Sequence, residues 1–148
     1  QQLSEAINLI QQALEEAPDS YSLNMQLSRL FATNNAYIKS VGVLTKLSLK
    51  RPSDVSIWFN LAEYAGLAGD ILALHKARTE FFLLRANFDS AENQVNNIIK
   101  KFGNNTTELA EAKQRLINIK KLRENSKIWA QIAGLKTEQR IHKQVTIN

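Results

Sequence analysis

Few side chains in this chain of 148 residues could do chemistry. His75 and His142 are its two histidines, they lie far apart, and there is no cysteine. A zinc peptidase helix carries His-Glu-x-x-His, which places two imidazoles and a general base on one face, and that spacing does not occur. Gly-x-Ser-x-Gly, the P-loop and Gly-x-Gly-x-x-Gly are missing as well. The sequence therefore predicts a chain without catalytic, metal-binding or cofactor-binding residues, in which His75 packs or lines a groove.

Positive charge is concentrated in the last third of the chain. Residues 1–99 carry 8 basic and 10 acidic side chains, whereas residues 100–148 carry 11 basic and 4 acidic ones. Such a face could contact nucleic acid, anionic lipid or an acidic protein, and the simpler alternative is a solvated helix surface. Only Phe102 and Trp129 are aromatic there, so no stacking platform supports nucleic-acid binding. The candidate basic face consists of Lys113, Arg115, Lys120, Lys121 and Arg123.

The elements that would position functional side chains are expected to be helices. The chain has only 2 prolines and 5 glycines, and no apolar run is long enough to span a membrane. Residues 1–20 have the pattern of an amphipathic helix, without the basic start and continuous apolar stretch of a signal peptide. Because the chain also begins without Met, we expect it to be a fragment of a longer protein.

The sequence repeats with a period of 34 residues. Shifting it by that length places Pro18 on Pro52 and Ser28 on Ala62. Within residues 58–70, WFNLAEYAGLAGD, bulky side chains alternate with small ones that let a second helix approach closely. A generic amphipathic helix does not explain prolines one period apart. The period and the pattern of small and large residues resemble the tetratricopeptide repeat (TPR).

The resemblance to TPR proteins implies an all-α fold, a right-handed TPR-like superhelix of antiparallel helix pairs with a C-terminal capping helix. The helix at about 70–85 is expected to close one repeat and open the next, with a degenerate last repeat as the alternative. The predicted TPR-like domain, 1–125, divides into the second helix of a truncated repeat (1–20), repeats 21–54, 55–86 and, overlapping, 72–104, and a capping helix (105–125). Residues 126–148 are predicted to be a helical extension or a frayed tail.

Three segments suggest a closer relationship. Trp-x-x-Leu-Ala at 58–62, FFLLRANFDSAENQV at 81–95 and AKQRLINIKKLRE at 112–124 together resemble the C-terminal TPR domain of periplasmic zinc metallopeptidases of the β-barrel assembly-enhancing type. That resemblance implies a non-catalytic, periplasmic protein-interaction module of Gram-negative bacteria. The module would recruit outer-membrane assembly machinery or misfolded client proteins, with zinc only in a protease domain outside this chain. The alternatives are a TPR scaffold of an unrelated secretion or cell-envelope complex and, less favoured, a nucleic-acid-binding module.

A protein-binding groove is expected on the first helices of the repeats. In TPR arrays, the concave surface comes from positions 2, 5, 9 and 12 of each repeat. If the shared helix contributes as well, the candidates are Ser22, Met25, Arg29, Ser56, Phe59, Asn60, Glu63, Lys76 and Glu80. This mixture of apolar and charged groups suits an extended or helical segment of another protein. Ordinary solvent exposure is the alternative for each residue.

Overall fold

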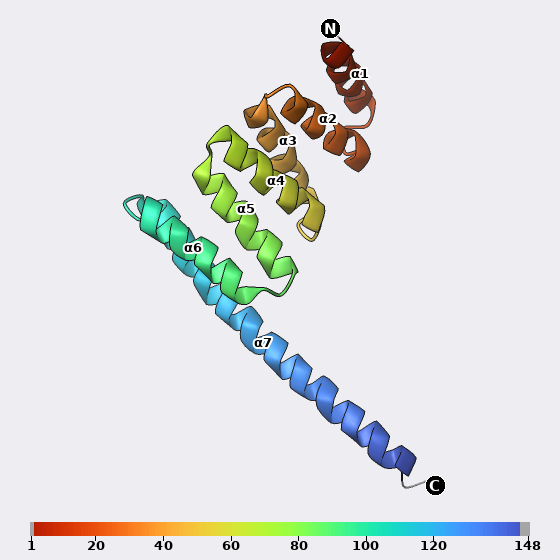
Figure 1. Cartoon of the computed structure of the whole chain (residues 1–148), viewed down its shortest axis with the longest axis vertical. Helices are drawn as coiled ribbons and strands as arrows, with labels where there is room; N and C mark the ends of the chain where they lie inside the picture. Colours follow the sequence, from red (N-terminus) through yellow and green to blue (C-terminus); the bar gives the residue numbers. More distant parts are fainter. Residues whose placement is uncertain (1, 146–148) are drawn as a thin grey trace.

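The computed structural model describes the backbone of residues 2–145 and the side chains of residues 2–134. The described chain is entirely helical and contains no strand. Its helices, in order, are α1 (Gln2–Glu16), α2 (Tyr21–Thr33), α3 (Tyr37–Lys50), α4 (Val55–Ala68), α5 (Ile71–Leu84), α6 (Phe88–Phe102) and α7 (Thr106–Val145). Short connections join them, and each helix packs against the next, so that they form a stacked array (Figure 1).

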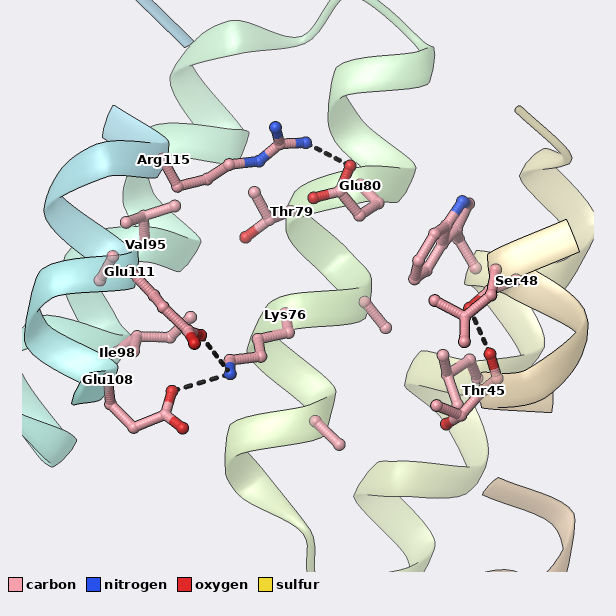
Figure 2. A pocket seen from close by; sticks show the side chains of 16 residues that line it. Thr45, Ser48, Lys76, Thr79, Glu80, Val95, Ile98, Glu108, Glu111 and Arg115 are labelled. Atoms are coloured by element: carbon pink, nitrogen blue, oxygen red, sulfur yellow. Dashed lines mark hydrogen bonds and ion pairs between the residues drawn. The ribbon is translucent and has the colours of Figure 1, made fainter. Parts of the chain in front are cut away.

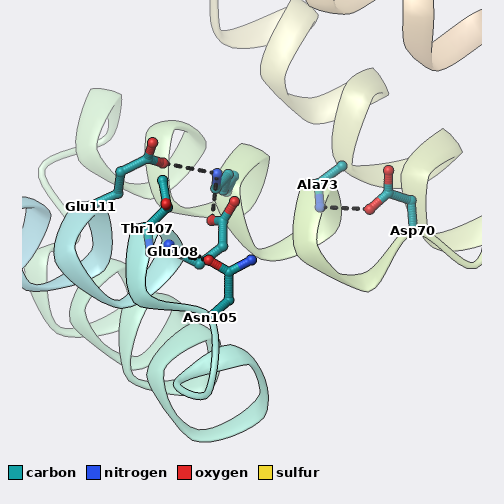
Figure 3. Close-up of polar contacts among 7 residues, drawn as sticks. Asp70, Ala73, Asn105, Thr107, Glu108 and Glu111 are labelled. Atoms are coloured by element: carbon teal, nitrogen blue, oxygen red, sulfur yellow. Dashed lines mark hydrogen bonds and ion pairs between the residues drawn. The ribbon is translucent and has the colours of Figure 1, made fainter.

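Polar side chains determine where the helices begin. The side chains of Asp54, Asp70 and Asn87 accept hydrogen bonds from backbone N–H groups in the first turns of α4, α5 and α6. Asn105 does the same for α7, accepting from the N–H groups of Thr107 and Glu108 (Figure 3). These caps satisfy N–H groups that the helix itself leaves without acceptors.

Small side chains lie buried between neighbouring helices. Ser28 of α2 and Ser40 of α3 are both fully buried, and the Ser40 hydroxyl donates to the Ser28 carbonyl at 2.7 Å. Ala62 of α4 is buried, as are Thr79 of α5 and Ala91 of α6. These residues therefore lie between neighbouring helices and do not face water. This is the packing that the repeat pattern predicts.

The core runs along the array as a series of clusters. Ile7 packs with Leu27 and other residues of α2 at the N-terminal end. A central cluster joins α2 to α5 and includes Leu44 and Ile57, both fully buried. At the other end, the cluster that contains Ile119 joins α6 to α7. Each helix is thus held by apolar contacts with its neighbours along the stack, as expected for a repeat architecture.

The last helix is much longer than the others. α7 begins beneath α6, where Ala112 and Ile119 are buried, runs back along it, and then continues past the N-terminal end of α6, away from the array (Figure 1). It crosses Asn125 without a break, so the predicted capping helix and the described part of the predicted C-terminal segment form one helix, Thr106–Val145. Beyond the packed part, Ile128 and Trp129 are exposed. No helix in the described part of the chain is long and apolar enough to cross a membrane.

Candidate functional site: a pocket between α3, α5 and α7

A pocket of about 400 Å³ opens between α3, α5 and α7. Figure 2 shows α5 in the middle, with Thr45 and Ser48 of α3 on one side and Glu108, Glu111 and Arg115 of α7 on the other. Its base is apolar and buried, and consists of Leu61, Ala77, Val95, Ile98 and Ala112. The stacking of the helices therefore brings segments up to 70 residues apart, from Thr45 to Arg115, around one cavity.

Two sets of ion pairs connect α5 to α7 along one side of the pocket. The Lys76 ammonium lies 2.8 Å from a carboxylate oxygen of Glu108 and 3.1 Å from one of Glu111. One helical turn further along both helices, Arg115 binds the carboxylate of Glu80. The buried Nε of Arg115 has no hydrogen-bond partner among the described residues. This side of the pocket is therefore charged and holds the two helices together.

The charges at Lys76 are unequally exposed. The side chain of Glu108 is 18% exposed, while those of Lys76 and Glu111 are 44% and 59% exposed. Burial alone would lower the pKa of the Lys76 ammonium, but hydrogen bonds and charge interactions with Glu108 and Glu111 outweigh it and raise that pKa above 10.5. Lys76 therefore stays protonated at neutral pH, in a locally negative environment.

The opposite side of the pocket offers apolar surface beside the hydroxyl groups of Thr45 and Ser48. Leu49 lines it from α3 and is 79% exposed. The indole of Trp58 also lines it, and its Nε1–H donates to the Pro52 carbonyl at 2.8 Å, which fixes the orientation of the ring. An apolar side chain entering the pocket would meet these two residues and the buried base. The pocket thus combines an apolar surface on α3 and α4 with a charged rim on α5 and α7.

Only two residues of the predicted groove line this pocket, namely Lys76 and Glu80. Met25 is 5% exposed and packs in the central cluster, so the prediction that it lies on an accessible groove is wrong. Its side chain belongs to the same core cluster as residues of α3, α4 and α5. Phe59 is exposed on α4 and contacts the ring of Phe81 at 5.8 Å between centroids.

The remaining groove candidates lie outside the pocket lining. Ser22, Arg29, Ser56 and Glu63 are exposed on α2 and α4, and Asn60 is partly buried. The prediction from the sequence missed the pocket because it considered only α5 and the first helices of the repeats, whereas much of the lining comes from α3 and α7. One signal in the sequence points to the pocket. Opposite charges recur 35 residues apart, about one repeat, in the pairs Lys76–Glu111 and Glu80–Arg115.

The predicted basic face is divided by ion pairs. Arg115 is engaged by Glu80, and Arg123 lies 2.8 Å from a carboxylate oxygen of Asp89 and 3.2 Å from one of Glu92. The exposed members of the face are Lys113, Lys120 and Lys121. Two of the five candidate cations therefore hold α7 on the array.

His75 is hydrogen-bonded to another side chain within the helical stack. His75 is 8% exposed, and its Nδ1 lies 2.8 Å from Oε1 of Gln94, which joins α5 to α6. His142 lies outside the described side chains. Among the residues whose side chains are described, no group of three or more His, Cys, Asp or Glu residues is placed to hold a metal ion.

Comparison with known proteins identifies the fold. No protein-family model matches the chain, and no curated protein matches its sequence. Among solved structures, it is similar to that of "MamA MSR-1 C2", a TPR-containing protein, with a TM-score of 0.50 and 16% sequence identity over 84% of this chain and 69% of that one. At this level of identity, the similarity shows the fold alone. The chain has an all-helical, TPR-like repeat fold, as the sequence predicts.

Proposed function

We propose that the chain is a non-catalytic protein-interaction module that holds a segment of another protein in the pocket between α3, α5 and α7. The observation that carries this proposal is the pocket itself, a cavity of about 400 Å³ with an apolar base and a charged rim. A few polar groups around an apolar hollow are typical of binding sites. The TPR-like fold favours a protein as the ligand, because such arrays present surfaces of this kind to other chains.

The apolar side of the pocket supplies the expected affinity. Leu49 is 79% exposed, and covering it together with the ring of Trp58 would remove apolar surface from water. Fully burying one leucine-sized side chain of the ligand contributes roughly 1.5–3 kcal/mol. The charged rim orients the segment, because its ion pairs are fixed on two helices that pack against their neighbours.

A displayed library of random 12-residue peptides, selected on the folded protein, tests this function. The affinities of the selected peptides for the wild-type protein and for Leu49→Ala and Leu67→Ala would be measured by calorimetry. Leu67 is the matched control, because it is an exposed leucine on α4 that does not line the pocket. We expect Leu49→Ala to weaken binding about fivefold, the equivalent of about 1 kcal/mol. Binding that Leu67→Ala weakens more than Leu49→Ala, or the selection of no peptide at all, would contradict the proposal.

A finer assignment is supported by the sequence resemblance alone. We propose on that basis that the module belongs to a periplasmic zinc metallopeptidase and recruits outer-membrane assembly machinery or misfolded client proteins. The alternative is a scaffold in an unrelated secretion or cell-envelope complex. The coding sequence around this segment distinguishes them: a signal peptide and a His-Glu-x-x-His motif in the same gene support the first, and a gene without that motif rejects it.

A further inference from the structure

The charges around the pocket indicate what kind of segment it accepts, an inference that rests on the proposed function. We infer that the bound segment carries a lysine or arginine close to an apolar anchor residue, with the cation at Glu111 and the anchor against Leu49 and Trp58. The inference follows from a charge count, from the exposure of one carboxylate and from the arrangement of the two sides of the pocket.

The pocket contains more carboxylates than cations. Glu80 and Arg115 form a one-to-one pair. Lys76 is shared by two carboxylates, those of Glu108 and Glu111. Among the lining residues, three negative groups therefore face two positive ones, and the Lys76 cluster has one negative charge in excess. A ligand that supplies a cation would neutralise this excess.

The excess negative charge is accessible at Glu111. Glu108 is the more buried of the two carboxylates, makes the shorter contact with Lys76 and lies in the first turn of α7, where the helix dipole favours a negative charge. Glu111 is 59% exposed and lies 3.1 Å from Lys76. Figure 2 shows both carboxylates directed toward the Lys76 ammonium. A cation from solvent can therefore reach Glu111 without breaking the more buried contact.

An acidic ligand does not fit this arrangement. The two cations of the pocket, Lys76 and Arg115, already bind carboxylates of the chain itself. A ligand carboxylate would have to displace Glu80 or Glu108 and would approach the excess negative charge at Glu111. Like charges brought together at an interface disfavour binding. We therefore expect acidic segments and chain-terminal carboxylates to bind this pocket weakly.

The apolar contacts lie across α5 from Glu111. Leu49 is on α3, and Glu111 is on α7. Figure 2 shows α5 between the labelled residues of these two helices. A segment lying across the pocket places one side chain on each side, so its basic and apolar residues are expected within a few positions of each other. A ligand with only a basic residue would lack the apolar contact. A ligand with only an apolar residue would bring no cation to Glu111.

The peptides selected from the random library test this inference by their composition and by one substitution in the protein. We expect lysine or arginine to be enriched within three positions of a leucine, isoleucine, phenylalanine or tryptophan. Glu111→Gln keeps the shape of the side chain and removes its charge. At low salt it should weaken binding of a selected basic peptide about three- to fivefold, as expected for an exposed ion pair. The matched control is Glu63→Gln, which removes an exposed carboxylate outside the pocket and should leave the affinity unchanged.

A second peptide completes the test. Replacing its lysine or arginine by glutamine should remove the effect of Glu111→Gln, because the two changes delete the same contact. Peptides that depend on Leu49 but lack basic residues, or whose affinity Glu111→Gln leaves unchanged, would overturn the inferred ligand chemistry while the proposed function stands. Peptides that are insensitive to Leu49→Ala as well would overturn both.

Discussion

Enlarging one small side chain between α2 and α3 should separate the helices and destabilise the fold. Ser40 is fully buried, and its hydroxyl donates to the Ser28 carbonyl at 2.7 Å. Ser40→Ala removes one hydrogen bond and should lower the free energy of unfolding by about 1 kcal/mol. Ser40→Leu loses the same bond and adds an overpacking cost of about 1–3 kcal/mol, so we expect a loss of roughly 2–4 kcal/mol.

Urea unfolding followed by far-UV circular dichroism measures these changes. Ile38→Ala is the matched control, because Ile38 is 78% exposed on the same helix and its truncation should change the free energy of unfolding by less than about 0.5 kcal/mol. If Ser40→Leu is as stable as the wild-type protein, then the close approach of α2 and α3 is not what holds this hairpin, and the repeat argument is refuted.

Two further predictions concern the attachment of α7. Ile119 is fully buried against α6, so Ile119→Ala should lower the free energy of unfolding by about 2–5 kcal/mol in the same urea assay, whereas Ile128→Ala, at a 51% exposed position further along the helix, should change it little. Because the pKa of Lys76 is raised in the folded state, its stabilising contribution is complete below its ordinary pKa of 10.5 and is lost as the pH rises through the folded value. The difference in urea midpoint between the wild-type protein and Lys76→Met should therefore be constant around neutral pH and shrink above about pH 10.5; a difference that grows there would contradict the assigned ion pairs.

Much of the fold could be predicted from local sequence signals. Buried Ser28, Ser40 and Ala62 occupy the small positions of the repeat. These small residues recur at a fixed period, so a single sequence contains the signal. The fold class followed from that period and from the pattern of small and large residues.

The site could be predicted only in part, because it depends on how helices stack. Lys76 and Glu80 were predicted to be exposed to a ligand, and they do line the pocket, but their partners come from α7. Met25 and Phe59 occupy the same position in successive repeats, but Met25 is buried and Phe59 is exposed. The position in the repeat alone therefore does not predict exposure. Which face of a helix is covered is decided by its neighbours, and that information is not in the helix's own sequence.

The central claim is that a polypeptide segment occupies the pocket between α3, α5 and α7, and the fluorescence of Trp58 tests it most directly. Trp58 lines the pocket, and the other tryptophan, Trp129, is 68% exposed far along α7, so Trp129→Phe leaves a single reporter. On titration with a selected peptide, we predict a saturable change in Trp58 emission whose midpoint matches the calorimetric Kd and moves to higher concentration in Leu49→Ala. Calorimetric binding of that peptide with no change in Trp58 emission would place the ligand elsewhere and contradict the account.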